Sequence, residues 1–365
     1  MAYGTINTDK LVGSSGGTIS PDSGVFRNRI INGAMVIDQR NAGASVTPIN
    51  NQYTLDRYYS VLSQASKYTV QQSTTAPAGF INSLKVTSSS AYSIGAGDYF
   101  ALYQAIEGLN VADLAWGTAN AKPVTLSFQV YSSLTGTFGG VITNSATDRS
   151  YPYTYTISSA NTWTSISVTI AGDTSGTWLT TNGVGLRVSF GLGVGSTYSG
   201  TAGSWAGALY LSATGATSVV GTNGATFYIT GVQLEKGSTA TSFDYRPYGT
   251  ELALCQRYYY RIQSSQSGNR IVVTNGLVNS TTNCIYCSGG FPATMRTSPT
   301  STQSGLNIND GSVTNSITSI SNTTSMPNGF SINFTTGTAT LTSGRTGFII
   351  GSNNLTDYLD FSAEL

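Results

Sequence analysis

The chain has 365 residues, of which 9% are charged, and its 17 Lys and Arg residues against 16 Asp and Glu residues leave a net charge of +1. It contains no histidine, the commonest general base and metal ligand near neutral pH. This composition argues against an enzyme, a metal site and a bound cofactor. The absence of a basic block also argues against a nucleic-acid-binding protein.

The length favours about two domains, and a hydrophobic content of 39% is enough to form their cores. No stretch approaches the ~18 consecutive apolar residues of a membrane span. Residues 1–13 lack the basic and apolar parts of a secretion signal. We therefore expect a protein that neither inserts into a membrane nor is exported, and that is assembled in a cytoplasm.

Residues 1–25 are small and polar, with a glycine- and serine-rich joint at Gly13 to Gly17. Such a segment has too few apolar side chains to offset its own ordering entropy, so it needs another surface to lie against. We expect an N-terminal arm that attaches the chain to a neighbouring subunit or to a larger assembly.

Residues 26–250 show the alternation typical of half-buried strands in antiparallel sheets. Apolar or aromatic side chains occupy every second position at Val124, Leu126, Phe128 and Val130, at Tyr151, Tyr153, Tyr155 and Ile157, at Ile166, Val168 and Ile170, and at Leu186, Val188 and Phe190. Many short strands with almost no helix predict an all-β fold, here a jelly-roll β-sandwich.

One strand of this region changes phase. Phe227 and Ile229 share one parity, whereas Val232 and Leu234 share the other. A β-bulge at or near Gly231 would return the second pair to the inward face. We therefore predict an irregular backbone at this glycine.

Residues 98–116 are the one helix candidate within this domain. Leu102, Ile106 and Leu109 recur there at helical spacing. Gly108 is a poor helix former, so the pattern predicts one or two turns at most.

Residues 251–365 predict a smaller C-terminal β domain. A short helical turn is expected at residues 251–256. Later strands are indicated by alternation at Tyr258, Tyr260 and Ile262 and at Phe330, Ile332 and Phe334. No internal repeat of fixed period is present, so neither a propeller nor a β-helix is supported.

The chain has three cysteines, Cys255, Cys284 and Cys287, so at most one internal disulfide can form. Cys284 and Cys287 are three positions apart, which in a regular strand places them on opposite faces. A zinc site would need a fourth soft ligand that the chain cannot supply from histidine. We expect three buried or reduced thiols and no metal.

Paired carboxylates are the alternative that would make this protein a glycan-cleaving enzyme. Five residues qualify by type alone, namely Asp56, Glu107, Asp113, Asp148 and Asp173. Asp56 and Asp148 are each followed directly by an arginine, which favours structural ion pairs. We therefore expect no catalytic residue.

Three aromatic residues are the candidate glycan-binding site. Trp178, Tyr198 and Trp205 lie among Gly, Ser and Thr, where loops are expected. Flat rings in polar loops are suited to stacking on sugar rings, with neighbouring hydroxyls and amides as hydrogen-bonding groups. The alternative is that each ring covers the end of the sandwich or fills a subunit contact.

Several segments resemble a group of bacteriophage virion proteins of the tail-fibre and collar type. The similar text lies at residues 28–43 (NRIINGAMVIDQRNAG), 53–59 (YTLDRYY), 126–140, 229–262, 291–300 (FPATMRTSPT) and 361–365 (FSAEL). The resemblance implies a virion component with a carbohydrate-binding-module-like jelly roll followed by a smaller β domain. It implies no catalytic residues.

Together these observations predict a phage fibre or adhesin subunit that binds host surface glycan and joins other virion proteins through residues 1–25. The resemblance to fibres implies a homo-oligomer, most simply a trimer, assembled in the host cytoplasm. A purely structural collar, neck or capsid-decorating fibre without receptor binding is the alternative, and a glycan-cleaving enzyme is the third.

Overall fold

The computed structural model describes residues 11–12, 18–19, 27–263, 271–351 and 356–365. The predicted arm of residues 1–25 lies outside the described residues except for two short strands. These are β1 (Leu11–Val12) and β2 (Thr18–Ile19), which pair antiparallel with each other.

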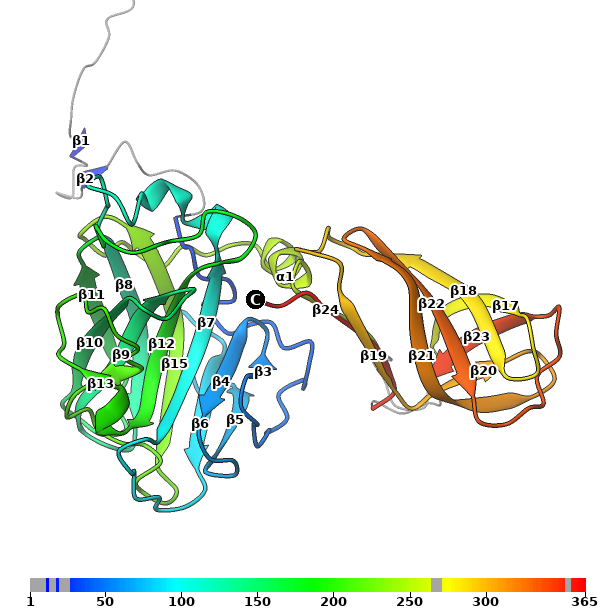
Figure 1. Ribbon diagram of the computed structural model, residues 1–365. Helices are drawn as coiled ribbons and strands as arrows, with labels where there is room; N and C mark the ends of the chain where they lie inside the picture. Colours follow the sequence, from blue (N-terminus) through cyan, green and yellow to red (C-terminus); the bar gives the residue numbers. More distant parts are fainter. Residues whose placement is uncertain (1–10, 13–17, 20–26, 264–270, 352–355) are drawn as a thin grey trace, which may run out of the picture.

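Two antiparallel sheets packed face to face form the first part of the chain (Figure 1). The six-stranded sheet has the order β10-β9-β12-β7-β4-β3, with β3 (Gln52–Leu55), β4 (Tyr58–Leu62), β7 (Tyr99–Glu107), β9 (Gly136–Asn144), β10 (Ser150–Ile157) and β12 (Val184–Val194). The five-stranded sheet has the order β11-β8-β15-β6-β5, with β5 (Tyr68–Ser73), β6 (Ser83–Ser88), β8 (Val124–Ser132), β11 (Thr164–Ile170) and β15 (Thr226–Lys236). This confirms the predicted all-β sandwich.

The core lies between the two sheets. The rings of Phe128 on β8 and Phe190 on β12 meet edge to face at 5.1 Å, and those of Phe138 and Phe227 stack at 6.0 Å. All four side chains are buried, as the alternation predicts for Phe128, Phe190 and Phe227. Shorter elements connect the strands: η1 (Gly108–Asn110), η2 (Ala112–Leu114), η3 (Ser196–Tyr198), β13 (Ser199–Gly200) and β14 (Ser212–Ala213).

The prediction of a helix within residues 98–116 is wrong. Residues 99–107 form strand β7 at the centre of the six-stranded sheet, and only the 3-10 turns η1 and η2 follow. Leu102 and Ile106 matched a helical spacing because positions four apart also share one face of a strand. Leu109 is 58% exposed, so the third residue of that pattern does not belong to the core.

The bulge expected at Gly231 is confirmed. The pairing of β15 with β8 shifts register between Thr230 and Gln233, and Gly231 has a φ of +60°. Phe227, Ile229, Val232 and Leu234 are then all buried in one core, because the extra residue restores the inward face.

The C-terminal domain is a closed six-stranded barrel joined to a three-stranded sheet. Its helix α1 (Tyr248–Gln256) confirms the expected helical turn. The sheet has the order β16-β24-β19, with β16 (Tyr259–Gln263), β19 (Thr300–Ser304) and β24 (Tyr358–Ser362). The barrel has the order β17-β18-β22-β21-β20-β23, with β17 (Val272–Val278), β18 (Asn283–Gly290), β20 (Leu306–Asn309), β21 (Thr314–Met326), β22 (Gly329–Thr336) and β23 (Thr346–Gly351).

The prediction that Cys284 and Cys287 point to opposite faces is wrong. Cys284 pairs with Phe334, whereas Cys287 pairs with Ile332, so β18 has one extra residue between the two pairs. The extra residue turns both thiols into the barrel interior, where both are fully buried.

The two domains meet at α1 and at the end of the chain (Figure 1). Arg257 donates two hydrogen bonds to Glu107 at 3.0 and 2.6 Å, and the hydroxyl of Tyr258 donates to Glu107 at 2.7 Å. Glu364 in turn pairs with Arg40 and with the buried Arg57. In the part of the chain that the structure describes, no helix is long and apolar enough to cross a membrane.

Candidate functional site

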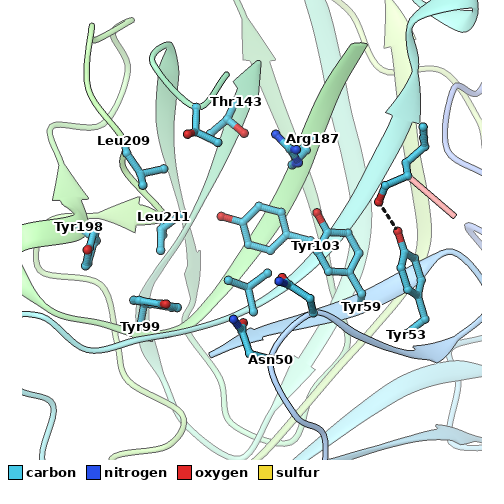
Figure 2. A pocket seen from close by; sticks show the side chains of 14 residues that line it. Asn50, Tyr53, Tyr59, Tyr99, Tyr103, Thr143, Arg187, Tyr198, Leu209 and Leu211 are labelled. Atoms are coloured by element: carbon cyan, nitrogen blue, oxygen red, sulfur yellow. Dashed lines mark hydrogen bonds between the residues drawn. The ribbon is translucent and has the colours of Figure 1, made fainter. Parts of the chain in front are cut away.

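The six-stranded sheet carries a pocket of about 510 Å³ on the face that points away from the core (Figure 2). Strands β3, β4, β7, β9 and β12 supply side chains to it, as does the segment that contains η3, β13 and β14. We call this pocket the tyrosine groove and define it by Tyr53, Tyr59, Tyr99, Tyr103, Arg187 and Tyr198.

Strand register places three tyrosines in one row across the floor of the groove. Tyr53 on β3 lies opposite Tyr59 on β4, and Tyr59 lies opposite Tyr103 on β7. Their ring centroids are 4.9 Å and 5.5 Å apart, with the rings tilted by 39° and 31°. Cross-strand aromatic pairs stabilise a sheet and hold each other in place. The floor is therefore fixed by the fold.

Tyr99 and Tyr198 form a wall of the groove. Tyr198 ends the 3-10 helix η3, and its ring meets the ring of Tyr99 edge to face at 5.3 Å. The backbone carbonyl of Tyr198 accepts a hydrogen bond from the N–H of Leu211 at 2.8 Å, which holds this segment against the sheet. Both rings are half-buried, so part of each ring faces solvent.

Polar groups lie beside the aromatic floor. Arg187 on β12 points into the groove above Tyr59 and Tyr103 (Figure 2). Its Nη1 donates to the backbone oxygens of Asn144 at 2.9 Å and Ser145 at 3.1 Å, which fixes the guanidinium. Thr143, directly opposite Arg187 on β9, has a buried Oγ1 without a hydrogen-bond partner among the described residues.

The phenol groups of the floor are neutral at physiological pH. Burial raises the pKa of Tyr59 and of Tyr103 above the usual value, although the Arg187 guanidinium partly offsets this effect at Tyr59. Burial and the Glu364 carboxylate raise the pKa of Tyr53 as well. Each hydroxyl therefore keeps its proton and can donate a hydrogen bond.

The C-terminal domain contributes to the groove through Leu365. The hydroxyl of Tyr53 donates to the backbone oxygen of Leu365 at 2.9 Å, and Leu365 packs against the cluster that contains Tyr59 and Tyr103. Arg296 holds the preceding residues, because its guanidinium donates to the backbone oxygens of Ala363 and Glu364, each at 2.8 Å. One edge of the groove therefore depends on contact between the domains.

Trp178 and Trp205 lie together, in a tryptophan cluster with Trp116. The ring centroids are 4.6 Å apart for Trp116 and Trp178, 5.3 Å for Trp116 and Trp205, and 5.4 Å for Trp178 and Trp205. All three pairs meet edge to face. Trp116 is buried, whereas Trp178 and Trp205 are half-buried and pack against the core of the sandwich.

The indole N–H groups of this cluster all donate to backbone oxygens. Trp116 donates to Lys122 at 2.7 Å, Trp178 to Ser175 at 3.1 Å and Trp205 to Ala171 at 2.8 Å. Tyr198 packs in a different cluster, with Tyr99 and Leu211, so the three predicted site residues do not share one surface. Glycan binding by Trp178, Tyr198 and Trp205 stays a prediction.

The five carboxylates considered for hydrolysis each have a structural partner. Asp56 accepts from Gln39, Glu107 from Arg257, Asp113 from Arg29, Asp148 from Asn144, and Asp173 from Arg149. Among the described residues, no three His, Cys, Asp or Glu side chains form a group that could hold a metal ion.

No protein-family model and no curated protein matches this sequence. Among solved structures, the chain is similar to the enzymatically active domain of tailspike protein 4 of bacteriophage CBA120, with 12% identity, a TM-score of 0.33, and coverage of 57% of this chain and 21% of that chain. It is also similar to a family 11 carbohydrate-binding module from Clostridium thermocellum, in complex with a β-1,3-1,4-mixed-linked tetrasaccharide (11% identity, TM-score 0.29, 55% of this chain and 100% of that chain).

A family 4 carbohydrate-binding module is similar at 15% identity and a TM-score of 0.28, over 56% of this chain and 97% of that chain. Superpositions of this quality are too loose to carry a ligand, an activity or a site residue to this chain. The function is therefore inferred from the groove itself.

Local sequence pattern does not predict most of the groove. Tyr198 is among the sequence-based candidates, whereas Tyr53, Tyr59, Tyr103 and Arg187 are not. One usable signal lies in β7, where tyrosine and alanine alternate with the core residues and leave no charged side chain on the outer face from Tyr99 to Ala105. An uncharged outer face on a central strand indicates a covered or ligand-facing surface.

Proposed function

We propose that this protein is a bacteriophage adhesin subunit that binds host surface glycan in the tyrosine groove and performs no catalysis. The observation that carries the proposal is the row of Tyr53, Tyr59 and Tyr103 on the outer face of the sheet, beside the half-exposed rings of Tyr99 and Tyr198.

The groove has the chemistry that a saccharide requires. A sugar ring presents apolar C–H faces, which pack on aromatic rings, and a belt of hydroxyls that need donors and acceptors. Tyr99 and Tyr198 supply partly exposed rings, while Arg187 and the neutral phenols of Tyr59 and Tyr103 supply donors. A volume of about 510 Å³ is within the range of small-ligand sites.

The arrangement of the carboxylates is consistent with binding without cleavage. Hydrolysis of a glycosidic bond requires two carboxyl groups on either side of the scissile bond. Asp56, Glu107, Asp113, Asp148 and Asp173 instead accept hydrogen bonds from separate partners within the fold. The proposal therefore assigns no catalytic residue.

The phage part of the proposal is supported by the segments that resemble virion proteins, such as residues 28–43 and 53–59. In this proposal, residues 1–25 attach the chain to other virion proteins, the subunits form a trimer, and assembly takes place in the host cytoplasm.

Deletion of residues 1–25 is expected to leave the β domains folded while preventing incorporation into particles. Normal incorporation of the truncated chain would place the attachment elsewhere.

Glycan binding can be tested with the full chain on an array of bacterial surface polysaccharides. The proposal predicts binding to at least one polysaccharide, with loss of the signal in a Tyr99→Ala variant. Tyr131→Ala is a matched control, because Tyr131 is also half-buried and meets Tyr228 edge to face at 5.1 Å, but on the five-stranded sheet. Absence of binding across the array, or equal loss in both variants, would refute the groove as the site.

A purely structural fibre is the second candidate, favoured by exposed apolar side chains on the barrel. Val272, Leu277, Tyr286 and Phe348 are 57%, 44%, 66% and 41% exposed and lie on the neighbouring strands β17, β18 and β23. Exposed apolar side chains close together often mark association surfaces. Sedimentation equilibrium of the chain with Tyr286→Ser and Phe348→Ser distinguishes the roles. Loss of the oligomer without loss of glycan binding would assign assembly to the barrel and adhesion to the groove.

A further inference from the structure

The barrel contains two thiols in direct contact. The Sγ atoms of Cys284 and Cys287 on β18 are 3.4 Å apart, and both side chains are fully buried. They share the interior because the bulge between them adds one residue to the strand. Within this bulge Tyr286 has a φ of +59° and a side chain that is 66% exposed.

A non-glycine residue in the left-handed region costs conformational free energy, and such outliers often mark functional positions. Here the unusual backbone has a visible result, because it brings two sulfur atoms together that a regular strand would separate. The contact is therefore a product of the bulge at Tyr286.

Two glycines on neighbouring strands leave room for the sulfurs. Gly276 on β17 pairs directly with Gly347 on β23. A β-carbon on Gly276 would lie 2.5 Å from Sγ of Cys287, and one on Gly347 would lie 2.6 Å from Sγ of Cys284. Any larger residue would displace the thiols, so this part of the barrel is shaped around the pair.

The two thiols differ in acidity. The hydrogen bond between the sulfurs lowers the pKa of Cys284 and, together with burial, raises the pKa of Cys287. The thiolate is the attacking species in thiol–disulfide exchange. Cys284 is therefore the side chain that reacts first, and Cys287 the one that completes the bond.

We propose that Cys284 and Cys287 are a modification site, at which a disulfide closes across the bulge of β18 when a small-molecule disulfide is the oxidant. The Cys284 thiolate, its proton released to solvent, attacks one sulfur of the oxidant and expels one thiolate. Cys287 then loses its proton, attacks the sulfur of Cys284 and expels the second thiolate. Two protein thiols become one disulfide, and one small disulfide becomes two thiols.

Closure of this bond fixes the bulge and with it the position of Tyr286. A disulfide needs its sulfurs about 2.05 Å apart, so the pair must approach from 3.4 Å. The change is a small one within a site that already holds both sulfurs. Cys255, buried in a separate cluster with Tyr258, does not take part and serves as an internal reference.

The test counts free thiols in the full chain. The protein is exposed to 2-hydroxyethyl disulfide, both folded and during refolding from urea, then labelled with N-ethylmaleimide in urea and weighed by mass spectrometry. Without oxidant, three labels are expected, because all three cysteines are free. With oxidant, one label is expected, located on Cys255, and the chain keeps its cooperative melting transition.

Single cysteine-to-alanine variants identify which two thiols form the disulfide. Cys255→Ala is expected to lose both remaining labels on oxidation. Cys284→Ala is expected to keep the label on Cys287, whereas Cys287→Ala is expected to hold a 2-mercaptoethanol adduct on Cys284, because the second thiol that would displace it is missing. Three labels in both arms of the experiment would overturn the proposal. So would a lasting adduct of 2-mercaptoethanol on Cys284 in the wild-type chain, a bridge to Cys255, or a pair that closes only in chains that no longer melt cooperatively.

Discussion

Gly231 faces the ring of Phe80 so closely that a β-carbon at position 231 would lie 2.6 Å from Cζ of Phe80. The same residue provides the φ of +60° at the bulge of β15. The packing of Phe80 and the phase change of β15 therefore both require a residue without a β-carbon at position 231.

Gly231→Ala is expected to lower the free energy of unfolding by at least ~1 kcal/mol, because alanine is strained at positive φ and would displace Phe80. Urea denaturation measures the effect. Gly97→Ala is the matched control, since Gly97 has no positive φ and a β-carbon there would meet nothing within 4 Å. Equal midpoints for the two variants would contradict the described bulge.

Asp56 is expected to make the sandwich less stable as the pH rises. Burial raises its pKa to about 6, although Arg40 and the hydrogen bonds from Gln39 act in the opposite direction. An unfolded aspartate titrates near pH 4, so between about pH 4 and pH 6 the folded state binds more protons than the unfolded state. Stability must fall across that window.

The test compares wild type with Asp56→Asn, which is neutral at every pH. The stability difference between the two proteins is expected to change by roughly 2 to 3 kcal/mol from about pH 4 to about pH 7, with wild type losing stability relative to the variant. Urea midpoints at both pH values measure it. A difference that does not vary with pH would show that Asp56 is ionised in the fold.

Asp310 in the barrel is expected to show the opposite pH dependence. Its carboxylate accepts hydrogen bonds from the N–H groups of Ser312, Val313 and Thr342, at 2.8 to 2.9 Å. These bonds, above all the one from Val313, hold its pKa well below the usual range. The stabilisation is present above about pH 4 and is lost as the pH falls through the folded pKa.

Asp310→Asn is expected to cost ~1 to 3 kcal/mol at neutral pH, because an amide cannot accept from all these donors with both of its polar atoms. Thermal melting of the two proteins measures the loss. The difference should narrow as the pH is lowered below about 4. A constant difference down to acid pH would contradict the assigned role of the carboxylate.

Trp205 is expected to contribute to stability through its cluster. Trp205→Ala removes edge-to-face contacts with Trp116 and Trp178 and leaves the carbonyl of Ala171 without its donor. A loss of roughly 1 to 3 kcal/mol in unfolding free energy is expected, with unchanged glycan affinity. Weaker glycan binding at an unchanged melting temperature would instead support the sequence-based prediction that Trp178 and Trp205 contact glycan.

The sandwich could be predicted from sequence because its strands bury one face. In β8, Leu126 and Phe128 alternate with Ser127 and Gln129, and the period of two is visible directly. Strand β7 hides the same period, because its outer face carries tyrosine and alanine beneath the groove. The polar alternation is then missing along most of the strand, and Leu102 and Ile106, four positions apart on one face, also fit a helical spacing.

The groove and the thiol pair depend on information that local pattern does not hold. Tyr53 and Tyr103 are far apart in sequence and meet through Tyr59 only once β3, β4 and β7 have paired in register. Cys284 and Cys287 share the barrel interior because one residue is inserted between them. Such an insertion reverses the face of every residue that follows it.

The most direct test of glycan binding in the tyrosine groove is isothermal titration of one polysaccharide, chosen from the array, into wild type, Tyr198→Ala and Tyr131→Ala. Tyr198→Ala is expected to weaken binding by about 1 to 3 kcal/mol, roughly a 5- to 150-fold rise in Kd, with little change in melting temperature. Tyr131→Ala is expected to bind as wild type does. Unchanged affinity in Tyr198→Ala, together with a loss in Tyr131→Ala, would place the glycan on the other sheet and contradict the proposed site.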